Sequence, residues 1–206
     1  IGCDTLECFK VSGIEAVANE EGVELRDIKR DKDLVKVAVR DFKSNIDYVM
    51  LPKFLLEADH LINLPILKAH ASMVFSGALK NIKGVVQDKV HMQMHQKNLT
   101  MAMMDVWSVC RADINIMDAM HAASGYSPHM PVPIDTDMIL GSKDPVAIDR
   151  VACEVTGIDT SSVDYFKVAE ETGLGNYSMD MIDVVGDSIE DCYKKNMAFG
   201  VVLIIV

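Results

Sequence analysis

The sequence predicts an α/β fold: a single domain with a largely parallel sheet flanked by helices. Apolar runs of strand length alternate with amphipathic segments of about 10 to 15 residues, the order of elements that builds parallel sheets. The chain has 206 residues, of which 50% are hydrophobic, so it can bury one sizeable core. We therefore treat residues 1–206 as one domain.

The first third of the chain predicts one short helix and three strands. Ser12 and Glu15 form a capping box, so a helix is expected to begin there and to end before Gly22. Residues 34–42 alternate apolar with polar side chains, the period of a half-buried strand. Two further apolar runs end at prolines and are expected to be strands: residues 48–51 and 60–64.

The middle of the chain predicts two helices, a short strand and a long loop. The stretch after Pro65 is expected to be a loop that leads into a helix at about 73–83. Residues 114–116 predict a strand, and the segment 120–133, with one glycine and three prolines, predicts a long loop of functional interest. The second helix is indicated by one apolar stripe: Leu99, Met103, Val106, Trp107 and Cys110.

The last third alternates strands and helices again. Residues 138–140 predict a strand, and Asp144 followed by Pro145 predicts the start of a helix that ends at Gly157. Three more elements are expected: a helix over about 162–172, a strand over 182–185 and a buried strand over 201–206.

The expected sheet brings separate loops to one edge, because ligands of parallel sheets bind at the carboxyl ends of the strands. The loops after Leu64, Ile116 and Leu140 would share that edge. This arrangement predicts that five side chains lie in one neighbourhood: Lys68, His70, Asp118, His121 and Asp144.

Charge is distributed unevenly along the chain. The net charge is −11, which argues against a nucleic-acid binder because such proteins need a basic surface. Residues 61–100, which we call the basic island, nevertheless carry five lysines and one acid. A basic island in an acidic protein predicts a small anionic ligand as the partner.

The cysteines and the hydropathy of the sequence indicate in which cellular compartment the protein is expected. The five cysteines form no C-x-x-C pair, which predicts free thiols in a reducing cytoplasm and no iron–sulfur cluster within this chain. No apolar run approaches the roughly 20 residues of a membrane helix, so no membrane partner is expected. The chain begins with Ile1 and has no signal-peptide pattern, so we expect a fragment of a longer chain.

The basic island contains the candidate binding residues. Lys68 and His70 are two apart and point to the same side of an extended chain. Lys80 and Lys83 are three apart and share a helical face with Gly84. Lysines beside a glycine suit a carboxylate or phosphate ligand that approaches the backbone closely. The alternative is a lysine-decorated helix surface.

Histidines and aspartates supply further candidates. His91 and His95 have the i, i+4 spacing of many metal sites, although they could equally form a surface pair. Asp144 is explained as a helix N-cap, and Asp149 follows in the second turn of the same helix. Dinucleotide, P-loop and serine-hydrolase signatures are absent from the sequence.

Four motifs resemble the family known as domain of unknown function 362, and the resemblance covers about residues 12–186. They are INLPILKAH (62–70), SGALKNIKG (76–84), GSKDPVAID (141–149) and VAEETGLG (168–175). Members are often described as iron–sulfur cluster proteins, and the domain frequently accompanies a ferredoxin-like module. The resemblance therefore implies a redox setting, with any cluster on other sequence or on a partner. It also implies that an N-terminal strand and helix of the family are missing from this sequence.

A more distant resemblance concerns the cofactor-binding region of lactate racemases. The pattern P-x-x-x-x-H followed by S-G-x-x-K is similar to their metal-pincer region. It implies that His70 faces nickel or substrate, that Lys80 bonds the cofactor, and that His91 or His95 is a later histidine of the site. The usual S-G-G-x-K is altered here at Ala78.

The leading hypothesis is a cytoplasmic α/β protein that binds an anionic ligand or a metal-bearing cofactor in a redox setting. One alternative is a lactate-racemase-like isomerase in which His70 and a second histidine act as acid and base. Another is a non-catalytic module that docks a ferredoxin. The expected site comprises catalytic His70 and Lys80, cofactor-binding Lys68, Asn81, Lys83, Gly84, Asp118 and Asp149, and metal-binding His91 and His95.

Overall fold

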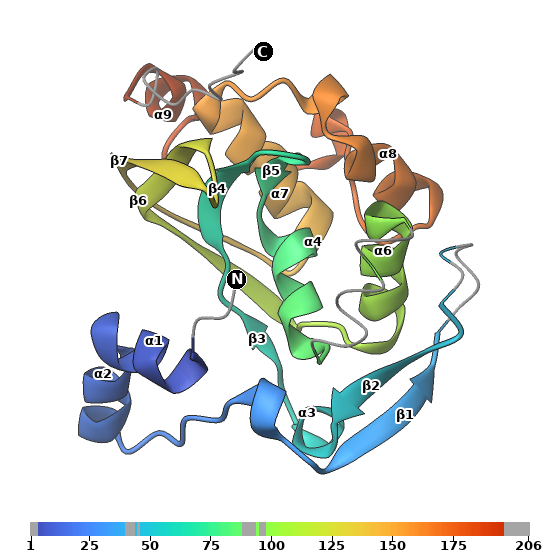
Figure 1. Cartoon of the computed structure of the whole chain (residues 1–206). Coiled ribbons are helices and arrows are strands. Elements are labelled where there is room, and N and C mark those ends of the chain that lie inside the picture. The colour runs from blue at the N-terminus through green and yellow to red at the C-terminus, as the bar shows by residue number, and fades with distance from the viewer. Residues whose placement is uncertain (1–3, 40–43, 45, 88–93, 95–97, 196–206) are drawn as a thin grey trace.

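Figure 1 shows the computed structural model of the chain, which describes residues 4–39, 44, 46–87, 94 and 98–195. Helices pack on a five-stranded sheet, and a separate two-stranded sheet lies beside it. The predicted α/β class is therefore confirmed. The expected strand at 201–206 and the histidines His91 and His95 fall outside the described residues.

The five-stranded sheet is parallel at its centre and antiparallel at both edges. β3 and β4 run parallel to β6, while β5 pairs antiparallel with β4 and β7 pairs antiparallel with β6. Pro65 separates β3 from β4, since a proline cannot donate to a ladder. The strands are β3 (Ile62–Asn63), β4 (Ile66–His70), β5 (Val74–Ser76), β6 (Ile114–Tyr126) and β7 (Met130–Ser142).

The long loop expected at 120–133 is wrong, because most of these residues form a β-hairpin. β6 and β7 stay paired from Asn115 opposite Ser142 to Tyr126 opposite Met130. β7 pairs only with β6 among the described strands, and such an edge strand tolerates its prolines without losing a ladder bond. The predicted strands at 114–116 and 138–140 are parts of this longer hairpin.

The antiparallel return of β7 also separates the five side chains that were expected to gather at one edge. Asp144 follows the end of β7, beside Asn115 at the start of β6. Lys68 lies opposite Ala123, near the other end of β6. The predicted common neighbourhood is therefore wrong for Asp144, because it assumed that these strands run parallel. Asp118, opposite Ile66, and His121, two residues before Ala123, do lie beside β4.

Helices cover the inner face of the sheet and form most of the core with it. Asn98 caps α6 by accepting a hydrogen bond from the backbone N–H of Met101, and Asp144 caps α7 as predicted. Leu67, Phe75 and Met117 of the sheet are fully buried beneath this layer. The helices are α4 (Ala78–Asn81), α6 (Leu99–Val109), α7 (Pro145–Thr156) and α8 (Asp164–Glu171).

Three further predicted elements differ from the structure. The stretch after Pro65, expected to be a loop, is strand β4, because it pairs with β5 and β6. The helix expected at 73–83 is instead β5, the single turn of α4 and the 3-10 turn η2 (Ile82–Val85), because Val74–Ser76 pairs with β4. The strand expected at 182–185 is irregular chain between η4 (Met179–Met181) and α9 (Ile189–Lys195). Val185 is 91% exposed, so the apolar run ends in solvent and not in a sheet.

The N-terminal third lies beside this core. It contains α1 (Thr5–Val11), α2 (Ile14–Glu21), η1 (Ile28–Arg30), β1 (Leu34–Ala38), β2 (Tyr48–Pro52) and α3 (Lys53–Glu57). Cys110, Cys153 and Cys192 are free thiols as predicted, whereas Cys8 is disulfide-bonded, so the all-thiol prediction is wrong there. None of the described helices is long and apolar enough to cross a membrane.

Candidate functional site

Lys68 and His70 lie on one side of β4, as their spacing predicts. Their neighbours Leu67 and Ala69 point into the core and are fully buried. Lys68 and His70 are half-buried on the opposite side. The strand therefore presents a lysine and a histidine together while its other face anchors it.

Lys80 comes next to this pair through the pairing of β5 with β4. Ser76 is the register partner of Lys68, and α4 begins two residues later. Lys80 therefore lies close to Lys68, and the like charges of the two side chains interact. Lys83, one helical turn further, is buried and interacts in turn with Lys80.

Burial and mutual repulsion make these lysines easier to deprotonate. Burial is the larger effect and the positive charge of Lys68 the smaller one, and together they lower the pKa of Lys80 to about 8. Burial and then the charge of Lys80 lower the pKa of Lys83 to about 8. Burial also lowers the pKa of Lys68. Within the described residues, Lys68 and Lys80 make no hydrogen bond or ion pair with any side chain.

The imidazole of His70 is oriented by the backbone that follows it. Its Nδ1 accepts hydrogen bonds from the N–H groups of Ser72 at 3.2 Å and Met73 at 3.3 Å. Nδ1 must be unprotonated to accept, so Nε2 carries the hydrogen of the neutral ring. His70 can therefore offer a donor, rather than a lone pair, at Nε2.

Asp149 holds the N-terminus of α4 from the neighbouring helix α7. Its carboxylate accepts hydrogen bonds from the backbone N–H of Ala78 at 2.6 Å and of Leu79 at 3.0 Å. The hydroxyl of Tyr165 donates to it at 3.4 Å. Asp149 is fully buried, and burial outweighs these bonds and raises its pKa to about 7. This residue fixes the position of α4, which carries Lys80.

The carboxylate of Asp149 explains why the S-G-x-x-K motif has a glycine at position 77. A Cβ on Gly77 would lie 2.1 Å from Oδ1 of Asp149, far inside contact distance. Gly175 has the same relation to Asp144, whose Oδ1 would lie 2.1 Å from an added Cβ. Gly84, the glycine expected to admit a ligand, has no atom within 4 Å of such a Cβ. The glycines of two motifs, Gly77 and Gly175, therefore pack against the aspartates of the GSKDPVAID motif.

Asparagines tie α4 to the sheet, a feature that sequence reasoning missed. Asn63 donates from Nδ2 to the carbonyl of Ala78 at 3.1 Å and to Oδ1 of Asn115 at 2.9 Å. Asn81, a predicted binding residue, donates from Nδ2 to Oδ1 of Asn63 at 2.8 Å. The sequence did contain a signal for this contact, because asparagines occupy inward positions of the predicted strands in INL and INI. Trp107 also donates from Nε1 to the carbonyl of Leu79 at 2.9 Å.

The other predicted site residues lie elsewhere. Asp118 is exposed on the outer face of the sheet, where its Oδ1 accepts from the N–H of Met120. His121 pairs with Asp135 at 2.7 Å on the β6–β7 hairpin, and both side chains are exposed. Nowhere among the described residues do three or more histidine, cysteine or acidic side chains gather as metal ligands would.

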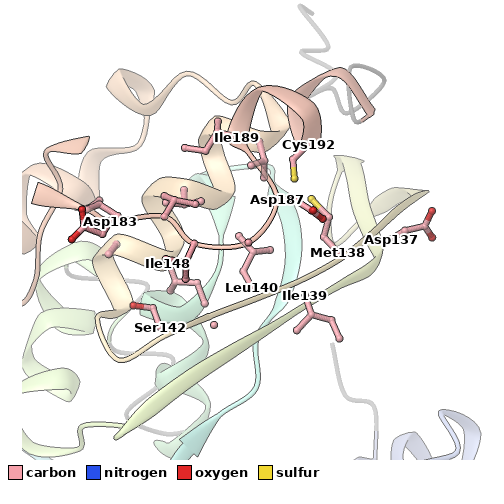
Figure 2. Close-up of a pocket in the computed structure, with 18 residues that line it drawn as sticks. Asp137, Met138, Ile139, Leu140, Ser142, Ile148, Asp183, Asp187, Ile189 and Cys192 are labelled. Atoms are coloured by element: carbon pink, nitrogen blue, oxygen red, sulfur yellow. The ribbon is translucent and has the colours of Figure 1, made fainter. Parts of the chain in front are cut away.

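A cavity of about 460 Å³ lies apart from the lysines, between β7, α7 and the segment 182–192. Figure 2 shows Leu140 of β7 and Ile148 of α7 facing this space, with Asp183 and Asp187 on the opposite segment. Its lining contains no lysine, arginine or histidine. An apolar, acidic cavity does not suit an anion, so we place the candidate anion site at the lysines.

Comparisons with known proteins agree with the motifs. The thylakoid-associated protein sll1697 of Synechocystis sp. is 25% identical to this chain over 136 residues, which are 63% of this chain and 42% of that protein. The chain thus spans less than half the length of this relative. No solved structure matches the chain. The family model described as domain of unknown function (DUF362) matches residues 1–154. The chain belongs to this DUF362 family.

Proposed function

We propose that the protein binds a small anion, a carboxylate or a phosphate, between Lys68 of β4 and Lys80 of α4. The observation that carries the proposal is that these two half-buried lysines interact with each other and pair with no acid in the described part of the chain. Lys83 extends the same positive region at the end of α4.

Electrostatics supports this function. Like charges brought together in a partly desolvated place oppose each other's ionisation, which is why the pKa of Lys80 is lowered to about 8. An anion between the ammonium groups would reverse both effects and favour the charged lysines. The free energy of binding would then include the relief of this repulsion.

The surroundings of α4 support a preorganised site. Asp149 caps the helix, Asn63 bonds its first carbonyl, and Trp107 bonds the carbonyl of Leu79. These contacts fix the backbone around Lys80 before a ligand arrives, so less ordering accompanies binding. His70 can add a neutral donor at Nε2 from the same side of β4 as Lys68.

The experiment is a fluorescence titration, because Trp107 is the only tryptophan of the chain and contacts the residue before Lys80. Pyrophosphate and oxalate serve as the phosphate and carboxylate probes. We expect a saturable change that is weakened at least tenfold by Lys80→Met and by Lys68→Met. Lys143→Met, an exposed lysine at the other end of the sheet, is the control and should leave the affinity unchanged. Equal affinity in all four proteins would refute the proposal.

The finer parts of the hypothesis remain predictions that rest on the family resemblance. They are a metal-bearing cofactor, a redox setting in the cytoplasm and a ferredoxin-like partner. A cofactor bonded to Lys80 would add to the intact mass of protein purified from its native source. A ferredoxin partner would bind through the basic island with a strong dependence on salt.

A further inference from the structure

The outer face of the five-stranded sheet is apolar and exposed. Ile66 of β4, Asp118 of β6 and Ile139 of β7 are neighbours across three strands on this face. Ile139 is 68% exposed. Exposed apolar residues at this end of the strands and in the link between β3 and β4 include Ile62, Leu64, Ile66, Met120 and Ile139. Parallel strands are normally covered on both faces, so such a surface indicates a docking site.

The helices α1 and α2 carry a second apolar surface without a partner. They pack mainly against each other, and Ala18 is the only residue of the two that is buried. Figure 1 shows them standing apart, across β3 from α4. Four of their apolar side chains are exposed: Leu6, Val11, Ile14 and Val17.

Charge makes the two surfaces complementary. Residues 4–24, the α1–α2 hairpin, contain six acids and one lysine, a net charge of −5. The outer face of β4 ends in Lys68 and His70, and Lys68 has no acidic partner among the described residues. The one acid in the middle of the face, Asp118, already accepts a hydrogen bond from the N–H of Met120.

The connection between hairpin and core allows movement. The guanidinium of Arg26 lies over the ring of Phe54 at 4.7 Å, and the amide of Gln87 holds η1 through two carbonyls. Residues 22–25 therefore form the linker between the hairpin and the core, and this linker spans at most about 14 Å when extended. An exposed ion pair between Arg30 and Asp4 also joins the hairpin to η1, and such surface pairs contribute little to stability.

We propose that the α1–α2 hairpin docks onto the outer face of the sheet of its own chain. Val17 and Ile14 would cover Ile66 and Ile139, and the acids of the hairpin would approach Lys68. The hairpin matches the face in both hydropathy and charge and is tethered beside it. Docking is tested separately from the anion site proposed above, and the acids of the hairpin would compete with a bound anion for Lys68.

Zero-length cross-linking tests this docking in the full chain. A water-soluble carbodiimide joins a lysine to a carboxylate when the two groups touch, and peptide mass spectrometry identifies the pair. A mixture of ¹⁴N- and ¹⁵N-labelled protein separates links within one chain from links between copies. We expect links between Lys68 and acids of residues 4–24 that carry a single isotope. Absence of such links, or links of mixed isotope only, would overturn the proposal, the second result in favour of a second copy.

Variants on each surface sharpen the test. Val17→Asp on the helix and Ile139→Asp on the strand should each reduce the Lys68 links at least fivefold. Both side chains are already exposed, and circular dichroism verifies that each variant stays folded. Val185→Asp, at an exposed valine of the irregular C-terminal segment, is the matched control and should leave the yield unchanged. A yield that both docking variants leave unchanged would contradict apolar docking.

Discussion

Replacing Gly77 with alanine should strongly destabilise the fold, although the change adds one methyl group. The new Cβ would lie 2.1 Å from Oδ1 of Asp149, 2.8 Å from its carboxyl carbon and 2.8 Å from the ring of Phe75. Both neighbours are fully buried and cannot simply swing into solvent. The carboxylate must move, and its bonds to the N–H groups of Ala78 and Leu79 then lengthen or break.

The magnitude follows from these contacts. A hydrogen bond to a charged group contributes about 1.5 to 3 kcal/mol, and overpacking a core costs about 1 to 3 kcal/mol. Losing one of the two bonds while straining the core would therefore lower the free energy of unfolding by about 3 kcal/mol or more. With a urea slope of about 2 kcal/mol per M, the midpoint should fall by about 1.5 M.

Urea unfolding followed by Trp107 fluorescence measures this change, and the same motif contains its control. Gly84→Ala meets no atom within 4 Å and should change the stability by no more than about 1 kcal/mol. In an Asp149→Ala background, Gly77→Ala should lose part of its effect, because the clashing carboxylate is gone and only the contact with Phe75 remains. Equal midpoints for Gly77→Ala and Gly84→Ala, or a full effect of Gly77→Ala without Asp149, would refute this explanation of the motif.

The remaining predictions concern pH and the contacts of α4. Burial raises the folded-state pKa of Asp149 to about 7, above its ordinary value of 3.8. The stability that protonated Asp149 contributes is therefore present below pH 4 and is lost as the pH rises through 7. In Asp149→Asn, this decrease of the urea midpoint with pH should disappear. The pKa of Lys80 is lowered from 10.5 to about 8. The stability that neutral Lys80 contributes is therefore present above pH 10.5 and is lost as the pH falls through 8. If Lys80→Met kept the wild-type dependence of the urea midpoint on pH between 8 and 10.5, this reasoning would be contradicted. Trp107→Phe leaves the carbonyl of Leu79 without its donor and should lower the free energy of unfolding by about 1 to 3 kcal/mol in thermal or urea melts, whereas a change under about 0.5 kcal/mol would show that this bond contributes little.

Local patterns predicted the elements whose signals are short-range. Asp144-Pro145 and Gly157 marked both ends of α7, and the apolar stripe from Leu99 to Cys110 located α6. The i, i+2 spacing of Lys68 and His70 correctly placed both on one side of an extended chain, although β4 itself was expected to be a loop. Each of these signals depends on residues within about one or two turns of each other.

Strand pairing could not be predicted in this way, because it joins residues far apart in the chain. The prolines and glycine of residues 120–133 favoured a loop locally, yet β7 lies at the sheet edge, where prolines are tolerated. The direction of β7 in turn decided that Asp144 and Lys68 lie at opposite ends of β6.

For the candidate site, the sequence indicated the lysines but not their surroundings. Lys68 and Lys80 were singled out by charge against an acidic background, and β4–β5 pairing brings them together. The burial of Asp149 and its contact with Gly77 depend on α7 packing against α4, which no local pattern reveals. The roles of the motif glycines were therefore visible only in the structure.

Calorimetry at pH 8 tests the anion site most directly. Near this pH Lys80 is about half protonated, because its pKa is about 8, so a bound anion that raises this pKa must draw a proton from the buffer. Titration with oxalate, which is fully ionised at this pH, in two buffers of different ionisation enthalpy measures that uptake. The proposed site predicts net proton uptake in the wild-type protein and a clearly smaller uptake in Lys80→Met, where only Lys68 and Lys83 can still gain protons. Binding without proton uptake, or the same uptake in Lys80→Met, would contradict it.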